Sequence, residues 1–390
     1  MNRRIFLSRG VLTGVALGAV NLASAGAGNS NDPNKASKAI LFTGDGVSLT
    51  PGEYTTRLIE EIQRRTIAPD NYSRHGVVEE LEMSFARELG KQRAIYLPTG
   101  TMANHLAMRC LTQPNNQAQR AIVPAECHLY NDSGDCAQQL SGINLVPLSK
   151  GKACFTLEEL RSTLEGFQSN RVATPVKAIL IESPVRRRDG ELVPFEQLKA
   201  ITSFAKENNI KTHLDGARLY IASAYTGVSP KTYAGLFDTV FVSLNKYFNA
   251  GSGAILAGSE EVIDGLYHTR RMLGGSLSQV WPFAAMALAY KKDFIQRLKN
   301  AITISEKLIA NLTASGLFAV RRIPNGSNIF AFTPKTADAT RFRKRLAERS
   351  IKIYEPDLGS GEFLVRVNET LNRTDAETLS QLFLEAAKGD

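Results

Sequence analysis

The sequence is poor in cysteine and contains no C-x-x-C pair. Its four cysteines are Cys110, Cys127, Cys136 and Cys154. Zinc sites and thiol-redox sites commonly use a C-x-x-C pair, so neither kind of site is expected. In an oxidising compartment these thiols could form disulfides, and their spacing leaves the pairing open.

The chain also lacks a long basic run. It carries 47 Lys and Arg against 38 Asp and Glu, a formal net charge of +9. Part of this excess lies in the first 25 residues, and the remainder is mild, so nucleic acid is not an expected partner. The densest basic cluster is Arg186-Arg187-Arg188. It is interpreted either as a solvated loop or as a recognition site for an anionic substrate group.

Only the first 25 residues contain an extended apolar stretch. Arg3 and Arg4 precede an apolar segment at 11–22, which ends at Ala23-Ser24-Ala25. A positive start, a short apolar core and an A-x-A site are typical of a signal peptide, here of the twin-arginine type. An uncleaved membrane anchor is the alternative, although the stretch is short for a span.

This start predicts a periplasmic protein that has no membrane contact after signal cleavage. We expect a signal peptide at residues 1–25, a linker at 26–40, a large domain at 41–285 and a small C-terminal domain at 286–390. With 390 residues and 43% hydrophobic content, the chain is long enough for two such domains.

Short apolar runs alternate with helical patterns through most of the large domain. Val78, Leu81, Phe85 and Leu89, for example, recur at helical spacing. Buried strands that alternate with helices are typical of an α/β fold whose mostly parallel sheet is covered on both faces. The strand-like runs are 94–97, 121–123, 144–147, 178–181, 211–214, 239–244 and 254–256.

A long helix is expected at 281–298, leading into the small domain. The patterns there predict an α+β unit of ordinary domain size. Its expected strands are 318–322, 328–332, 352–354 and 363–367, and its expected helices are 302–312, 339–349 and 375–387.

Several polar residues follow directly after strand-like runs. Ligands of an open parallel sheet bind at the carboxyl ends of its strands. Thr99-Gly100-Thr101 ends one run and opens a helix, which favours a phosphate or is simply a turn with a Thr cap. Asp215 closes another run and could be a helix cap. Lys246 and Glu182 close two more and could be solvated.

In combination these residues predict a site for pyridoxal phosphate (PLP). A lysine amine is the nucleophile that attaches the PLP aldehyde. A carboxylate keeps the pyridine nitrogen protonated, and backbone amides at a helix start bind the phosphate. The glycines of Asn249-Ala250-Gly251-Ser252-Gly253 let the backbone pass close to the cofactor.

From about Phe42 to Arg366 the sequence resembles the threonine aldolase and β-eliminating lyase family. Three stretches carry the resemblance: Pro98-Thr99-Gly100-Thr101-Met102-Ala103-Asn104, His213-Leu214-Asp215-Gly216-Ala217-Arg218-Leu219 and Ser243-Leu244-Asn245-Lys246. It implies the aminotransferase-like PLP fold, fold type I, with a seven-stranded, mostly parallel sheet. It also implies a homodimer or homotetramer.

The resemblance also implies roles for individual residues. Thr99, Gly100 and Thr101 would hold the phosphate, and His128 would stack on the pyridine ring and take part in catalysis with Lys246. Asp215 would pair with the ring nitrogen. Arg218 would contact the cofactor or the substrate, and Arg366 would bind the substrate α-carboxylate as a bidentate pair.

Four departures from the family pattern concern the substrate side. The S-D-T-V-T-x-P pattern becomes Gly44-Asp45-Gly46-Val47-Ser48-Leu49-Thr50-Pro51, and E-N-T-H becomes Glu182-Ser183-Pro184-Val185. G-G-G-M-R-Q becomes Gly274-Gly275-Ser276-Leu277-Ser278-Gln279, and Y-G-x-D-P-T becomes Tyr72-Ser73-Arg74-His75-Gly76-Val77. A hydroxyl, a His and an Arg are therefore missing or moved.

The main hypothesis is retro-aldol cleavage of a β-hydroxy-α-amino acid to glycine and an aldehyde. This reaction needs a base near the β-hydroxyl, and His128 is the first candidate, with His75 the second. The lost His motivates the alternatives of β-elimination, racemisation or transamination of an amino acid. A non-catalytic amino-acid binder is a third hypothesis, although binding alone does not need Lys246.

Overall fold

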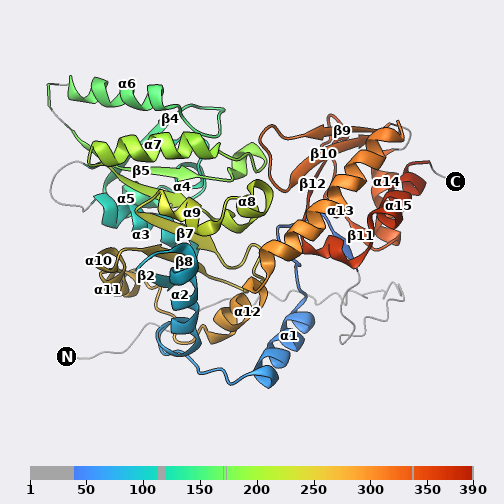
Figure 1. Ribbon diagram of the computed structural model, residues 1–390, viewed down its shortest axis with the longest axis horizontal. Helices are drawn as coiled ribbons and strands as arrows, with labels where there is room; N and C mark the ends of the chain where they lie inside the picture. Colours follow the sequence, from blue (N-terminus) through green and yellow to red (C-terminus); the bar gives the residue numbers. More distant parts are fainter. Residues whose placement is uncertain (1–38, 113–118, 170, 173, 336–337, 389–390) are drawn as a thin grey trace, which may run out of the picture.

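The computed structural model describes residues 39–112, 119–169, 171–172, 174–335 and 338–388. A seven-stranded sheet forms the centre of its larger part (Figure 1), in the order β2-β8-β7-β6-β5-β3-β4. The pairs β3–β4, β3–β5, β5–β6 and β6–β7 are parallel, whereas β8 runs antiparallel to β2 and β7. The strands are β2 (Arg93–Leu97), β3 (Gln119–Pro124), β4 (Ile143–Leu148), β5 (Val176–Glu182), β6 (Lys211–Asp215), β7 (Thr239–Ser243) and β8 (Ala254–Gly258).

The mostly parallel sheet predicted from the apolar runs is confirmed, and both of its faces are covered. In β7, Val240 and Val242 join one core cluster, whereas Phe241 between them joins another that includes α3. This alternation follows from the two-residue period of a strand. The helices of this part are α1 (Pro51–Arg64), α2 (Gly76–Leu89), α3 (Gly100–Thr112), α4 (His128–Asn131), α5 (Cys136–Ser141), α6 (Leu157–Gln168), η1 (Arg186–Arg188), α7 (Phe195–Glu207), α8 (Leu219–Thr226), α9 (Pro230–Gly235), α10 (Glu260–Asp264), α11 (Leu266–Met272) and α12 (Trp281–Lys291).

The C-terminal part, orange to red in Figure 1, forms a smaller α+β unit. Its three-stranded antiparallel sheet has the order β12-β10-β9. Its elements are α13 (Phe294–Ala314), β9 (Phe318–Arg322), β10 (Ile329–Pro334), α14 (Ala339–Glu348), β11 (Ile351–Lys352), β12 (Phe363–Arg366), η2 (Glu369–Arg373) and α15 (Ala376–Lys388).

The N-terminal strand β1 (Ile40–Leu41) does not join the large sheet. It pairs in parallel with β11 of the C-terminal unit. The amide of Arg366 also donates to the carbonyl of Phe42 at 2.9 Å. The described part of the chain therefore begins on the small unit and crosses to the large one in the residues that follow.

The single long helix expected at 281–298 is wrong. Lys292 and Asp293 separate α12 from α13, and Asp293 has a φ of 55°. Asp is among the residues that tolerate this left-handed conformation. A residue in this conformation interrupts the regular hydrogen bonding of the helix. No helix in the described part of the chain is long and apolar enough to span a membrane.

Candidate active site

Three polar side chains follow parallel strands at one edge of the large sheet. Asp215 ends β6, Glu182 ends β5, and the two residues lie opposite each other in the strand register. Lys246 follows β7, which pairs in parallel with β6. Because parallel strands end at the same edge, residues from distant parts of the sequence gather there.

The Asp215 side chain is held firmly in place. It is 2% exposed. Its Oδ2 accepts a hydrogen bond from Nδ2 of Asn104 at 2.6 Å, and its Oδ1 accepts one from the amide of Ala217 at 3.1 Å. Asn104 Oδ1 in turn lies 3.0 Å from Nε2 of His213, whose Nδ1 contacts Thr239 at 2.8 Å. Burial lowers the pKa of His213 to about 4, so its ring is neutral at neutral pH.

Lys246 is half-buried, and within the described ranges its amine makes no hydrogen bond or ion pair. Burial lowers its pKa, and the nearby Arg218 guanidinium lowers it further. The carboxylates of Asp215, Glu182 and Asp45 act in the opposite direction. A lysine with a lowered pKa is a stronger nucleophile at neutral pH, because more of it is unprotonated.

Glu182 is buried, in contrast to the solvated position that the sequence left open. Its Oε2 accepts from the amide of His128 at 2.7 Å, and its Oε1 accepts from the amide of Arg186 at 2.8 Å. Burial raises its pKa to about 7, and the neighbouring Asp215 carboxylate adds to this. The signals in the sequence were its place at the end of an apolar run and its match to the Glu of the family's E-N-T-H pattern.

His128 begins the short helix α4 beside this group. Its Nδ1 lies 3.2 Å from Oγ of Ser133. Burial lowers its pKa, the charge of Asp215 opposes this, and the charge of Lys246 lowers the pKa further. His128 therefore lies close enough to Asp215 and Lys246 for their charges to shift its pKa, and its ring is neutral at neutral pH.

Thr99, Gly100 and Thr101 form the start of α3 as expected. Thr99 Oγ1 caps the helix by accepting from the amide of Met102 at 3.1 Å. A Cβ added to Gly100 would lie 2.4 Å from Cζ of Phe241. This glycine therefore lets α3 pack closely on β7, a reason that the sequence did not reveal.

The two predicted substrate arginines converge on Asp45, which follows β1. Arg218 Nε donates to Asp45 Oδ2 at 2.7 Å, and Arg366 Nη1 donates to Asp45 Oδ1 at 3.2 Å. Asn328 also donates to Asp45 Oδ1, at 3.1 Å. The sequence placed Asp45 only in a stretch that departs from the family pattern and assigned it no contact.

The positions that differ from the family pattern have taken other roles. Val185 is fully buried, so it offers no polar group to a ligand. Arg186 and Arg187 both pair with Asp132, and Arg188 pairs with Glu191. His75 lies 3.7 Å from Glu79 and is largely exposed, apart from the strand-end group.

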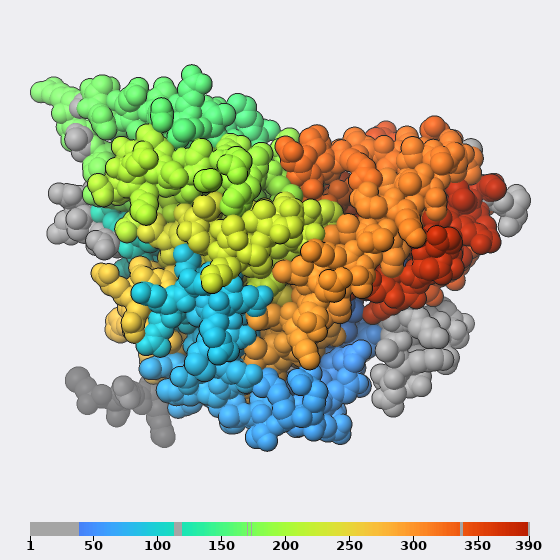
Figure 2. Space-filling view, in the orientation of Figure 1, coloured from blue at the N-terminus to red at the C-terminus, as the bar shows by residue number. Residues whose placement is uncertain are grey.

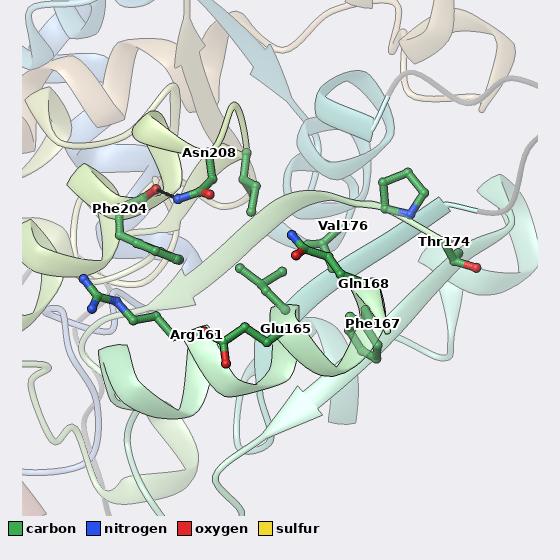
Figure 3. A pocket seen from close by; sticks show the side chains of 11 residues that line it. Arg161, Glu165, Phe167, Gln168, Thr174, Val176, Phe204 and Asn208 are labelled. Atoms are coloured by element: carbon green, nitrogen blue, oxygen red, sulfur yellow. Dashed lines mark hydrogen bonds between the residues drawn. The ribbon is translucent and has the colours of Figure 1, made fainter. Parts of the chain in front are cut away.

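A cavity of about 500 Å³ between α6 and α7 lies away from this group (Figure 3). Thr174 and Pro175, which line it, precede β5, and Ile210 precedes β6. The cavity is thus at the amino ends of these strands, opposite Glu182 and Asp215. Its side chains do not form part of the candidate site.

Lys246, Asp215 and the start of α3 fit PLP. A half-buried amine without an ion pair among the described residues suits covalent attachment of an aldehyde. A buried carboxylate with two fixed donors suits a protonated pyridine nitrogen, and the first turn of the 13-residue α3 suits a phosphate. The described residues contain no cluster of metal-ligating side chains, and their four cysteines are free thiols.

Comparison with known proteins identifies relatives of this chain. Low-specificity L-threonine aldolase of Saccharomyces cerevisiae is 27% identical over 266 residues, 67% of each chain. Alanine racemase TOXG of Cochliobolus carbonum is 28% identical over 57% of this chain and 56% of its own length. The chain thus spans between about half and two thirds of these curated relatives.

A crystal structure from Listeria monocytogenes has the same fold. That protein, assigned as an L-allo-threonine aldolase, is 27% identical, with a TM-score of 0.74. The match covers 90% of this chain and 96% of the other. It confirms the predicted PLP-dependent fold type I.

The relatives contradict the predicted periplasmic location. The matching low-specificity threonine aldolases come from yeasts and from Arabidopsis thaliana. These relatives are eukaryotic enzymes, whereas the predicted location assumed bacterial export by the twin-arginine route, so the prediction is wrong. The twin-arginine signal expected at 1–25 lies outside the described residues, as does most of the linker expected at 26–40; Ile40, its last residue, already begins β1.

The family expected from the sequence is confirmed. The sequence model of the beta-eliminating lyase family matches residues 53–333, which is well over half of the chain. The three stretches that carried the resemblance all lie within this match. The chain therefore belongs to the beta-eliminating lyase family.

Proposed function

We propose that this protein is a PLP-dependent aldehyde-lyase that cleaves a β-hydroxy-α-amino acid to glycine and an aldehyde. The observation that carries the proposal is the placement of Lys246 and Asp215 at the same carboxyl edge of the sheet, in a member of this family. The relatives named low-specificity L-threonine aldolase point to threonine-like substrates.

The cofactor is pyridoxal phosphate, and we assign each part of it to residues of this chain. Lys246 would attach its aldehyde, Asp215 would pair with its ring nitrogen, and His128 would stack on its ring. Thr99, Gly100 and Thr101 bind its phosphate at the start of α3. When bound, PLP withdraws electrons from the substrate Cα, so that a bond to Cα can break.

The remaining residues bind the substrate and move its proton. Arg366, supported by Arg218, binds the α-carboxylate through a charge-assisted pair. His128 acts as the base that accepts the proton of the β-hydroxyl. Its Nδ1 faces Ser133, which leaves Nε2 for the substrate, and its lowered pKa keeps it neutral at neutral pH.

Racemisation of an amino acid is the second candidate. The alanine racemase relative favours it, as does the buried Val185 at the position of the family's His. Separate incubations with threonine, with allo-threonine and with L-alanine distinguish the two candidates. Aldehyde release supports the lyase, whereas inversion of L-alanine without aldehyde supports the racemase.

The spectrum of the Lys246→Ala variant tests the central assignment. We expect the purified wild type to show a visible absorption band that borohydride removes, because the cofactor is linked covalently to the lysine. The variant should lack this band and lose activity, since only Lys246 supplies the amine. Lys199→Ala, which changes an exposed lysine on α7, is the control and should retain both. A wild-type spectrum in the variant would contradict the assignment.

We also propose that the chain assembles into a homodimer or homotetramer. Helix α1 has no buried residue and exposes Ile59 and Ile62 by almost half (Figure 2, blue, at the lower edge). Exposed apolar side chains grouped on one helix are typical of a protein interface. Sedimentation of the purified protein measures the assembly size.

The predicted leader at 1–25 is tested by sequencing the mature N-terminus.

A further inference from the structure

Asp45 is the centre of a buried cluster to which both domains contribute. It is 8% exposed, and its carboxylate accepts hydrogen bonds from Arg218, Arg366 and Asn328. Arg218 follows β6 of the large sheet, whereas Arg366 ends β12 and Asn328 precedes β10 of the small one. One carboxylate thus fixes the position of two guanidinium groups that belong to different domains.

The segment around Asp45 is also packed against the loop that carries Lys246. A Cβ added to Gly46 would lie 2.9 Å from the carbonyl oxygen of Lys246 and 2.6 Å from Oδ1 of Asn249. The amide of Val47 donates to the same Asn249 oxygen at 2.9 Å. Asp45 is therefore held in a fixed place relative to the lysine as well as to both arginines.

The cluster carries one net positive charge. Burial on its own raises the pKa of Asp45, but the guanidinium groups of Arg218 and Arg366 outweigh this and lower it below its usual value. Asp45 is thus ionised and neutralises one of the two arginines. Arg366 is 21% exposed at its side chain, and only its Nη1 has a partner in the described part of the chain. Its other donors are free for a ligand.

We propose that Asp45 is a positioning residue that orients Arg366 and Arg218 and sets the pocket charge to accept a single carboxylate. The inference rests on the proposed amino-acid lyase function. A substrate with one α-carboxylate would neutralise the remaining charge. A second carboxylate would meet no free cation in this cluster and would be repelled by Asp45, which gives selectivity by repulsion.

Inhibition by two simple acids tests the charge. Acetate and malonate, which carry one and two carboxylates, would compete with the β-hydroxy amino acid on the holoenzyme of the wild type and of Asp45→Asn. The Asn side chain has the same shape without the charge. We expect the potency of malonate relative to acetate to rise about 10-fold in the variant, because the pocket gains one positive charge. In Asp45→Asn, the KM for the amino-acid substrate should also rise by a larger factor than the factor by which kcat falls.

Asp238→Asn is the matched control. Asp238 accepts hydrogen bonds from Thr212 at the opposite end of the strands, so its loss should leave the malonate-to-acetate ratio unchanged. A purely structural role of Asp45 would weaken both acids alike. Asp45→Glu keeps the charge but displaces Arg366, and it should raise KM while keeping the wild-type ratio.

Each result has a clear meaning. An unchanged ratio in an active Asp45→Asn enzyme overturns this inference and leaves the proposed function intact. If that variant does not fold, an unchanged KM in Asp45→Glu overturns it instead. A wild type that forms no glycine and binds neither acid overturns the proposed function together with the inference.

Discussion

At the residue scale, the site depends on side chains that orient its reactive groups. Asp215 is held by Asn104, and Asn104 by the neutral His213, whose other nitrogen contacts Thr239. All four side chains are buried. A buried polar chain of this kind is stable only while each member has its partner.

Replacing Asn104 should therefore weaken cofactor binding. In Asn104→Ala, Asp215 and His213 each lose a partner, at a cost of about 1–3 kcal/mol for a buried polar group. We expect the dissociation constant of PLP, measured by equilibrium dialysis, to rise at least about 10-fold, since 1.4 kcal/mol corresponds to that factor. Asn208→Ala, at the carboxyl end of α7, is the control. Equal PLP affinity in both variants would refute a role for Asn104.

At the element scale, α2 and α11 protect the edge of the large sheet. The strand β2 is the first in the sheet order, so its outer side has no neighbouring strand. There the amide of Tyr96 donates to Oε1 of Glu82 at 2.7 Å, and its carbonyl accepts from Nη1 of Arg270 at 2.7 Å. Two buried ionisable side chains thus replace the missing strand and block edge-to-edge pairing.

This arrangement predicts a pH-dependent stability. Burial raises the pKa of Glu82 to about 7, from 4.5 in the unfolded chain. Between pH 4.5 and pH 7 the folded state binds a proton at Glu82 more tightly than the unfolded chain does. The contribution of Glu82 to the stability of the fold is therefore present below pH 4.5 and is lost as the pH rises to 7. Glu82→Gln cannot titrate. The Tm of Glu82→Gln minus the Tm of the wild type should therefore increase as the pH rises from 5 to 8.

The size of this effect is limited by the pKa shift, because one pKa unit corresponds to about 1.4 kcal/mol. Thermal unfolding in buffers from pH 5 to pH 8 measures it. Glu80→Gln, at an exposed position of α2, is the control and should follow the wild type. A Tm difference that does not vary with pH in Glu82→Gln would contradict the prediction.

At the scale of the whole molecule, the N-terminal segment ties the two domains together. Asn368 is fully buried, and its Nδ2 donates to the carbonyls of Leu41 at 2.7 Å and Gly44 at 2.8 Å. The segment that carries Leu41 and Gly44 continues to Asp45 and lies against the loop that carries Lys246. The small domain is therefore held to the active site by hydrogen bonds as well as by apolar packing.

Removing this link should destabilise the protein. In Asn368→Ala the carbonyl of Gly44 loses this partner, whereas that of Leu41 keeps only the Thr370 hydroxyl at 3.2 Å. A buried carbonyl without a partner costs about 1–3 kcal/mol. We expect a lower urea midpoint and a higher KM, since Arg366 and Asp45 lose their fixed separation. Asn372→Ala removes an exposed bond to the carbonyl of Arg297 and should change the midpoint much less. Similar midpoints for the two variants would argue against the link.

Local patterns in the sequence were enough to predict the fold class and to select candidate cofactor residues. Apolar runs predicted the strands, and Asp215, Lys246 and Thr99 stood out because each follows such a run. Strand ends meet at one edge of a parallel sheet, so position along the chain was sufficient to bring these residues together.

The tertiary structure decided the contacts between distant segments. Asp45 meets Arg218 and Arg366 across 173 and 321 residues of chain. Asn104 reaches Asp215 across 111 residues. No local pattern encodes such pairs, because they depend on how α3, β1 and β12 pack around the sheet. The sequence thus determined which cofactor the protein holds, and only the folded structure revealed how Asn104 holds Asp215 and how Asp45 holds Arg218 and Arg366.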